Sequence, residues 1–389
     1  MHPNLLAFLF AGLGMNSIIK FMSDRYSSLC PNIATILIVG IPSILIAMIF
    51  KDGLLANDQS DNYHLQNYAR SILMTLPANA TLFINYDQQW TSIRYLQECE
   101  AVRKDITSIH IGMMSYPWWQ HKRDLYSQVK FPGTHNTKAN TVHWKNGGFT
   151  FSELIDVNYS GSSGIFIGGK LTHSDPNYLR DYAEIPHGIV SQIVKQTDTN
   201  PSPEAFRVKS QKVWKKVIEE YARGFPDTHK YGEDTWEQTI VREFFDHYVT
   251  RATHLLDLVV SGDPQDMVLA SLVESCAWLE LAHLNDPLSS KSSGLWKNLG
   301  LCYMRAVQNQ ETKIPIFNNF MQGESLMKYK VIDIWWDHLS ADEEWKTWAS
   351  KRWQHSWGKF LHMDDAKEDQ SYESVKSIFE TVTKSIVKA

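Results

Sequence analysis

The pattern of residues 76–119 constrains the fold more than any other part of the chain. An apolar run at residues 80–84 follows Pro77, and a second run, rich in β-branched residues, covers residues 106–111. Between them, apolar side chains recur near helical spacing after Thr91, which predicts a helix capped at that residue. A strand, a helix and a second strand at these separations form a right-handed βαβ unit. We therefore expect the two runs to be parallel neighbours in one sheet.

Further α/β elements are predicted downstream. Residues 149–157 resemble a short helix capped by Thr150 or Ser152, because either hydroxyl can accept from the first free N–H groups. Residues 164–168 form an apolar run bounded by glycines, and residues 184–194 contain another strand pattern. Together these patterns predict a small sheet of three to four strands with helices around it.

After residue 201 the strand signals disappear and helical periodicity dominates. The expected helices are 203–221, 234–260, 263–284, 292–307 and a last one from Tyr372. Such helices with short connections usually form antiparallel pairs. A tryptophan cluster from Trp335-Trp336 to Trp357 is expected to be core or interface packing, with sugar stacking as the alternative.

The helix at residues 292–307 contains a recognisable motif. Trp296, Leu299, Gly300 and Tyr303 follow the opening spacing of a tetratricopeptide repeat. A glycine at this place lets a partner helix approach closely, while the large side chains fill the groove. The motif has no second clear copy at the repeat period. It therefore indicates either a degenerate repeat domain with a concave binding surface or an ordinary helical bundle.

The amino-terminal region contains two uncharged apolar segments. Residues 33–50 would form a helix about 27 Å long, which predicts a bilayer-spanning helix rather than a buried core helix. Residues 5–19 are either a first membrane helix or a cleaved signal peptide. The linker between them carries Lys20 and Arg25, and the positive-inside rule places it in the cytosol. We therefore expect a membrane hairpin, with the rest of the chain in the lumen.

These patterns predict a chain of three parts. The expected fold class is α/β plus all-α, with two amino-terminal transmembrane helices, a small α/β sheet domain and a helical, degenerate tetratricopeptide-like region. The expected boundaries are residues 1–52 for the membrane anchor, 53–200 for a lumenal α/β domain and 201–389 for a helical repeat-like domain. A length of 389 residues accommodates this division.

Charge and residue spacing argue against several functions. The net charge of −5 gives no electrostatic case for nucleic acid binding. No Gly-rich fingerprint follows the first strand, so a dinucleotide cofactor is not expected. His135 and His143 lie eight residues apart without cysteine or acidic companions, which argues against a metal site. The prediction is a chain without a cofactor or a metal ion.

The four cysteines fit no zinc pattern; they are Cys30, Cys99, Cys276 and Cys302. Cys276 and Cys302 fall on consecutive predicted helices. In a lumenal location they can form a disulfide, and two unrelated buried thiols are the alternative. The sequence leaves both alternatives open.

Residues 65–190 carry a family resemblance. The residues behind it are Leu76-Pro77-Ala78-Asn79-Ala80, Asp87, Arg94-Tyr95-Leu96-Gln97, Glu100, Arg103, Asp105, Met113-Met114-Ser115-Tyr116, Trp118 and Phe131-Pro132-Gly133. In these positions the chain resembles the lumenal, carboxyl-terminal half of the transmembrane protein 260 family, O-mannosyltransferases of the C-type glycosyltransferase class, and related bacterial membrane proteins. It departs from the family pattern at Lys104, where proline is usual, and at Thr134-His135-Asn136.

The resemblance implies an activity, partners and a location. Proteins of this family transfer mannose from a lipid-linked donor to Ser or Thr of secretory proteins, with receptor immunoglobulin-like domains as the implied acceptors. The implied location is the endoplasmic reticulum membrane, with the large domain in the lumen. The acid that acts on the acceptor hydroxyl in such enzymes lies in a first lumenal loop, which residues 20–31 are too short to supply. The chain is therefore expected to lack the catalytic membrane half and to contain no catalytic residue.

Four residues are candidates for substrate binding: Asp87, Arg94, Tyr116 and Trp118. Asp87 follows a predicted strand, where α/β folds usually place ligands, and helix capping is the alternative role. The other three lie in the segments that carry the resemblance.

Two sequons predict N-glycosylation, at Asn158-Tyr159-Ser160 and Asn79-Ala80-Thr81. Asn158 lies in a glycine- and serine-rich loop and is the expected acceptor. Asn79 directly precedes a predicted buried strand, so its accessibility is the open question.

Two other functions are compatible with the sequence. One is a membrane-tethered helical-repeat binding module that recruits a protein acceptor without catalysis. The other is a cytosolic adaptor, which the helical-repeat signature alone would allow. Topology separates them, because a lumenal domain excludes the adaptor.

Overall fold

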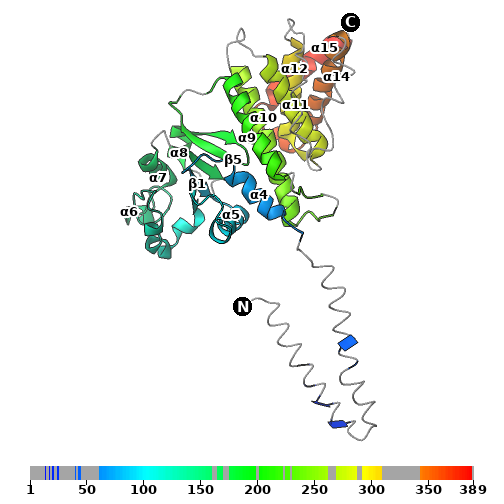
Figure 1. Cartoon of the computed structure of the whole chain (residues 1–389). Helices are drawn as coiled ribbons and strands as arrows, with labels where there is room; N and C mark the ends of the chain where they lie inside the picture. The colour runs from blue at the N-terminus through cyan, green and yellow to red at the C-terminus, as the bar shows by residue number, and fades with distance from the viewer. Residues whose placement is uncertain are drawn as a thin grey trace. The chain divides into compact units, whose positions relative to one another are not determined.

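The computed structural model describes residues 61–159, 164–169, 175–198, 201–221, 224–227, 230–261, 269–286, 291–308 and 342–387, with a few single positions before residue 61. The chain divides into two compact units, Met1–Asn62 and Tyr63–Ala389. All elements discussed below belong to the second unit (Figure 1).

The predicted pair of transmembrane helices is not supported, and this part of the expected fold class is wrong. Among the described residues, no helix combines the length and the apolar character that crossing a bilayer requires. Most of residues 5–19 and 33–50 lie outside the described residues. What the structure shows is a mixed five-stranded sheet with helices.

The sheet is built around β1, Thr81–Ile84. It pairs in parallel with β2, Thr107–His110, on one side and with β3, Ile165–Gly168, on the other. The order β2-β1-β3-β5-β4 is completed by β4, Tyr182–His187, and β5, Val190–Lys195. β5 is antiparallel to both β3 and β4. The predicted parallel pairing of the first two strands is confirmed.

Alternation along the strands gives the sheet two apolar faces, since successive side chains of a strand point to opposite sides. In β1, Leu82 and Ile84 pack into a core shared with the long helices, which we call the helix-face core. Phe83 packs into a second core with Ile109 and Ile167, which we call the pocket-face core. The sheet thus separates two hydrophobic cores.

The crossover after β1 is α5, Asp87–Cys99. It begins four residues before Thr91, whose hydroxyl donates to the carbonyl of Asp87 within the helix instead of capping it. The second crossover contains α6, Val142–Lys145, and α7, Phe151–Asn158. Thr150 caps α7 in a capping box with Glu153, as one of the two predicted capping choices.

The single strand predicted within residues 184–194 is two strands joined by a tight turn. Gly188 adopts φ +66 at the turn, a conformation that favours glycine. A Cβ there would lie 3.1 Å from Val217, so the turn also packs closely on helix α9, Pro203–Tyr221. The resulting hairpin explains why the sheet has five strands rather than three or four.

The long helices contact the sheet directly. α4, His64–Leu73, and α9 pack against each other, and α10, Trp236–Ser261, contacts α4, α9 and β4 (Figure 1). Tyr68 of α4 donates 2.7 Å to Glu243 of α10, and Gln89 of α5 donates 2.8 Å to the same phenol oxygen. The helix-face core therefore continues without a break from the sheet into the helical region.

The remaining helices extend this packing. They are α8, Pro176–Asp181, beside β4, then α11, Leu269–Asn285, α12, Ser293–Gln308, α14, Asp342–Leu361, and α15, Tyr372–Val387. Four short 3₁₀ turns complete the described elements: η2, Gly112–Ser115, η3, Pro117–His121, η4, Arg123–Leu125, and η7, Asp365–Glu368. Trp335-Trp336 lie outside the described residues, whereas Trp345, Trp353 and Trp357 are buried in the helix-face core.

Gly300 of α12 allows a close contact between α12 and α14. A Cβ on Gly300 would lie 2.0 Å from Cδ1 of Trp357 on α14. Trp296, Leu299 and Tyr303 are buried around it. The predicted role of the Trp-Leu-Gly-Tyr motif in close helix packing is therefore observed, while its reading as a tetratricopeptide repeat stays a prediction.

A buried ion pair joins α11 to α14. Arg352 donates from Nε to Glu280 at 2.6 Å and from Nη2 to its second oxygen at 2.8 Å. Tyr303 of α12 also donates to Glu280, at 3.0 Å. The side chains of Glu280 and Arg352 are only 5% and 19% exposed, so the pair is largely removed from water. The carboxylate of Glu280 therefore links three helices, α11, α12 and α14.

Cys276 and Cys302 are free, buried thiols on α11 and α12. Burial raises the pKa of the Cys276 thiol, and the neighbouring Cys302 adds to this effect. Cys99 is free and exposed, and Cys30 lies outside the described residues. Of the two alternatives for Cys276 and Cys302, the structure has adjacent thiols rather than a disulfide.

Candidate functional site

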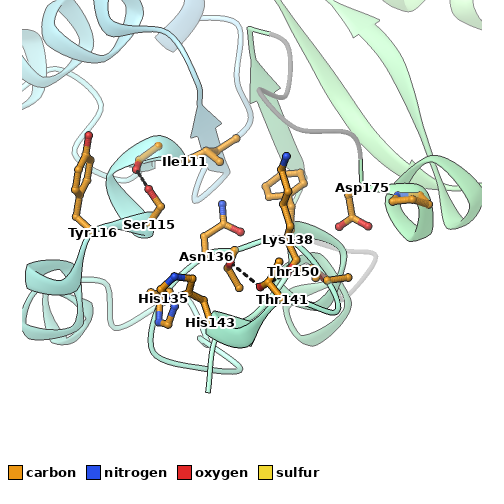
Figure 2. Close-up of a pocket in the computed structure, with 15 residues that line it drawn as sticks. Ile111, Ser115, Tyr116, His135, Asn136, Lys138, Thr141, His143, Thr150 and Asp175 are labelled. Atoms are coloured by element: carbon orange, nitrogen blue, oxygen red, sulfur yellow. Dashed lines mark hydrogen bonds between the residues drawn. The ribbon is translucent and has the colours of Figure 1, made fainter. Parts of the chain in front are cut away.

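A pocket of about 540 Å³ opens beyond the carboxyl end of β2, and we call it the aromatic pocket. Its walls come from the segment after β2, from a loop at residues 135–143, and from the starts of α7 and α8. Ligands of α/β folds bind at the carboxyl ends of parallel strands because loops of variable sequence meet there. Figure 2 shows Asn136 and Lys138 rising from the loop toward the open space, between Tyr116 on one side and Asp175 on the other.

The loop that forms the floor of the pocket is fixed by backbone hydrogen bonds. Thr134 N donates to the carbonyl of Gly147 at 2.7 Å, and Phe149 N donates to that of His135 at 2.9 Å. Asn136 N donates 2.8 Å to the carbonyl of Met114, which joins the loop to the segment after β2. Because its backbone is bonded on both sides, the loop presents its side chains in a defined arrangement.

Tyr116 and Trp118 form an exposed aromatic shelf at the edge of the pocket. Their rings are stacked, with centroids 6.0 Å apart and planes at 9°. Tyr116 is 55% exposed and Trp118 is 47% exposed, although Trp119 beside them is buried. Large aromatic side chains are usually buried. A stacked pair that is exposed to solvent therefore marks a surface that suits the apolar face of a ligand.

Polar groups face the shelf across the pocket. Among the described residues, the amide of Asn136 has no hydrogen-bond partner and the ammonium group of Lys138 has no ion-pair partner. Asp175 is already engaged, because its Oδ1 accepts from the N–H groups of Asn177 and Tyr178 and its Oδ2 accepts from Ser152 N at 2.9 Å. The pocket therefore offers hydrogen-bond donors, and its one lining carboxylate is used to join α7 to α8.

Asp87 lies at the first residue of α5, where a carboxylate is favoured by the helix dipole. His110, at the end of β2, holds it by a contact of 3.1 Å between Nε2 and Oδ1. Met113 N donates to Nδ1 of the same ring at 3.2 Å, so Nδ1 is the acceptor and Nε2 carries the proton. Both ring nitrogens are occupied, and His110 therefore orients Asp87 and is not placed to act as a general base.

Arg94 lies about two helical turns after Asp87 along α5. It forms an ion pair of 2.7 Å with Glu98, and its guanidinium lies 5.4 Å from the ring centre of Trp90. Arg94 and Asp87 do not line the aromatic pocket. Tyr116 lines it, and the ring of Trp118 stacks on the ring of Tyr116. The four predicted residues thus fall into two pairs, which His110 connects through its bond to Met113 in the turn before Tyr116.

Sequence reasoning missed the polar floor of the pocket. The sequence gives no role to Asn136 or Lys138, and it considers a site role for His135 and His143 only as metal ligands. In the structure the two histidine rings meet edge to face, 5.9 Å apart, and His135 also contacts the hydroxyl of Thr134. The available signal was Gly133 and Gly148, where a Cβ would lie 2.4 Å and 2.5 Å from the opposite strand of the loop. Glycines at both ends of a loop indicate that it closes on itself.

The two sequons differ in accessibility. Asn79 is exposed in the turn before β1, with φ +57, and its backbone N–H donates to Asp105 at 3.2 Å. The side chain of Asn158 is occupied: Oδ1 accepts from Lys130 N, and Nδ2 donates to the carbonyls of Lys130 and Leu154, all at 2.8 Å. In the folded chain the free amide is therefore that of Asn79.

Comparison with known proteins finds relatives that share one protein name. A Dictyostelium discoideum protein named protein O-mannosyl-transferase tmem260 is 27% identical over an alignment of 407 positions, and the alignment covers 98% of this chain. The chain is therefore similar to a TMEM260 protein along almost its whole length. A Mus musculus protein named protein O-mannosyl-transferase TMEM260 is 25% identical over 192 residues, which cover 48% of the chain. The resemblance predicted from residues 65–190 is confirmed.

This chain matches only part of each relative. The matched region is 44% of the Dictyostelium protein and 26% of the mouse protein, so this chain spans less than half the length of these relatives. No family model matches the sequence. No solved structure is similar to it.

Proposed function

We propose that this chain takes part in protein O-mannosylation and that its aromatic pocket binds a mannosyl group. The observation that carries the proposal is the similarity across 98% of the chain to a protein named as an O-mannosyl-transferase. The proposed donor is a lipid-linked mannose, the proposed acceptors are Ser or Thr of secretory or receptor immunoglobulin-like domains, and the proposed location is the lumen of the endoplasmic reticulum. These details follow from the family resemblance.

The pocket has the chemistry that a hexose requires. One face of a pyranose ring is made of C–H groups, which pack against the electron-rich face of an aromatic ring. Its hydroxyls then need hydrogen-bond partners on the other side, and Asn136 and Lys138 lie opposite Tyr116 in the pocket (Figure 2). A cavity of about 540 Å³ lies within the range of small-ligand sites.

Replacing the aromatic shelf is expected to weaken sugar binding without unfolding the chain. Tyr116→Ala should weaken binding of an O-mannosylated threonine peptide at least about tenfold, since loss of a stacked ring costs on the order of 1.4 kcal/mol. The measurement is isothermal titration of the purified chain with that peptide and with its unmannosylated form. Trp236→Ala removes an equally exposed aromatic side chain of α10 and should leave binding unchanged.

A cellular test addresses the proposed function itself. Removing the chain from cells that express it should lower the O-linked mannose on secretory proteins, measured by mass spectrometry of released peptides. Wild-type chain should restore the mannose, and Tyr116→Ala should not. Unchanged O-mannose after removal would overturn the proposal.

A lumenal location predicts a glycan at Asn79 rather than at Asn158. In secreting cells the chain should show a glycosidase-sensitive mass shift, because Asn79 is exposed and the Asn158 amide is hydrogen-bonded. Thr81→Ala removes the first sequon without replacing Asn79 at its left-handed φ, and should abolish the shift. Ser160→Ala removes the second sequon and should leave the shift intact. Absence of any shift in wild type would argue against the lumenal location.

A binding module without catalysis is the second candidate function. Among the residues that line the aromatic pocket, Asp175 is the one carboxylate, and backbone N–H groups occupy both of its oxygens. General acid–base chemistry on a hydroxyl needs a carboxylate or imidazole free to exchange a proton. The imidazoles of His135 and His143 also line the pocket, so a transferase would have to use one of these two groups there. If the purified chain binds mannosylated peptide but transfers no mannose when supplied with donor, the binding module is favoured.

A further inference from the structure

A second pocket lies near the amino-terminal ends of β1 and β3, whereas the aromatic pocket lies beyond the carboxyl end of β2. It has a volume of about 380 Å³ and is lined by the segment before β1, by Gly164 before β3, by His187 and Gln192 of the hairpin, and by α9. Lys209, Lys212 and Lys216 of α9 all line it, and we call it the lysine pocket. Residues three and four apart share one face of a helix, so the three ammonium groups lie on the same side.

The positive charge of the lysine pocket is not neutralised within the described residues. None of the three lysines forms an ion pair there, and Lys209 donates 2.9 Å to the amide oxygen of Gln192 instead. Two carboxylates on and beside α9 have other partners, because Glu220 pairs with Arg70 at 3.0 Å and Glu274 pairs with Arg207 at 3.0 Å. Glu219 is exposed three residues from Lys216 and does not line the pocket. Like charges on one helix face repel one another. An anion bound in the pocket would offset this repulsion by attracting all three ammonium groups.

His187 lies within the electrostatic field of two of these lysines. Its side chain lines the pocket and is buried, with Nε2 bonded to the carbonyl of Thr75 at 3.0 Å. The pKa of His187 is lowered to about 4: burial is the main cause, the hydrogen bond to Thr75 opposes it, and the charges of Lys209 and Lys216 add to the lowering. For Lys209, burial alone lowers the pKa, and no carboxylate opposes that effect.

We propose that the lysine pocket binds a phosphomonoester group. Three ammonium groups around a small cavity suit a compact dianion with several acceptor oxygens, and lysine is a common point-charge partner of phosphate. Leu76, Pro77 and Phe166 supply an apolar wall for the organic part of the ligand. The cavity is of small-ligand size. The site is separate from the aromatic pocket, and the proposal does not depend on O-mannosylation.

The test compares lysines that line the pocket with one that does not. The full chain is titrated with inorganic phosphate at constant ionic strength, and its sedimentation is measured with phosphatidylcholine vesicles that contain or lack phosphatidic acid. Lys212→Gln/Lys216→Gln should weaken binding at least tenfold. Lys215→Gln removes an exposed charge from the same helix outside the pocket and should change binding less than twofold. Circular dichroism melting checks that both variants are folded.

The outcomes separate the source of the phosphate. Binding of inorganic phosphate that depends on Lys212 and Lys216 supports the proposal with a soluble phosphate ester as ligand. Binding to phosphatidic acid vesicles alone, with the same dependence, supports it with a lipid headgroup as ligand. Binding to neither probe, or an equal loss in Lys215→Gln, overturns it.

Discussion

Gly300→Ala is expected to destabilise the chain by about 2–3 kcal/mol, although alanine is the better helix former. The added methyl group would lie 2.0 Å from Cδ1 and 2.4 Å from Nε1 of Trp357. Trp357 cannot move away easily, because it is buried and its Nε1 donates to the carbonyl of Lys297 at 3.1 Å. Overpacking of this kind costs about 1–3 kcal/mol and sometimes more, which exceeds the gain of about 1 kcal/mol from helix propensity.

The control lies in the same helix. A Cβ on Gly294 of α12 would meet no atom within 4 Å, so Gly294→Ala should be neutral or slightly stabilising. Urea unfolding followed by circular dichroism measures both variants, and a change in midpoint at constant slope reports the change in stability. Equal stability of the two variants would show that α12 and α14 are not in the described close contact.

Glu280→Ala is expected to cost about 3–5 kcal/mol, the larger of the two effects. Removing one partner of a buried ion pair leaves an uncompensated charge, here the guanidinium of Arg352 at 19% exposure. Tyr303 also loses the acceptor of its 3.0 Å hydrogen bond. The same urea unfolding experiment measures the loss.

A second variant distinguishes an unpaired charge from lost packing. Glu280→Leu/Arg352→Leu removes both charges and should recover at least half of the loss, because an apolar pair of similar size avoids the cost of desolvation. Asp364→Asn breaks an exposed pair with Lys367 and should produce no measurable change. If the double variant is less stable than Glu280→Ala, the ion pair itself stabilises the helices.

Local patterns were enough to predict most elements of the second unit. The β1–α5–β2 order followed from two apolar runs separated by a helical period, and Pro203 with its acidic neighbour predicted α9 with its observed bounds. The hairpin of β4 and β5 was missed because a single glycine, Gly188, is the only turn signal between its two strands. The start of α5 was placed too late because Tyr86 caps it without a side-chain hydrogen bond, so no capping residue marked it.

Only those residues of the candidate site that lie in a recognisable sequence motif could be predicted. Tyr116 and Trp118 were found because they lie in a recognisable motif, and both are exposed together. Asn136 and Lys138 could not be placed, since their position depends on a loop that returns to Met114 through a long-range backbone bond. The role of His110 was invisible for the same reason: its partner Asp87 is 23 residues away.

The two cores on either side of the sheet have a consequence for how such a chain can change under natural selection. The aromatic pocket rests on the pocket-face core, through Ile111 and Phe151, whereas the long helices rest on the helix-face core. Effects of substitutions at well-separated sites usually add independently. New ligand preferences can therefore arise in the loop at residues 135–143 while the helices keep their stability, and descendants of one ancestral scaffold can diverge in what they recognise.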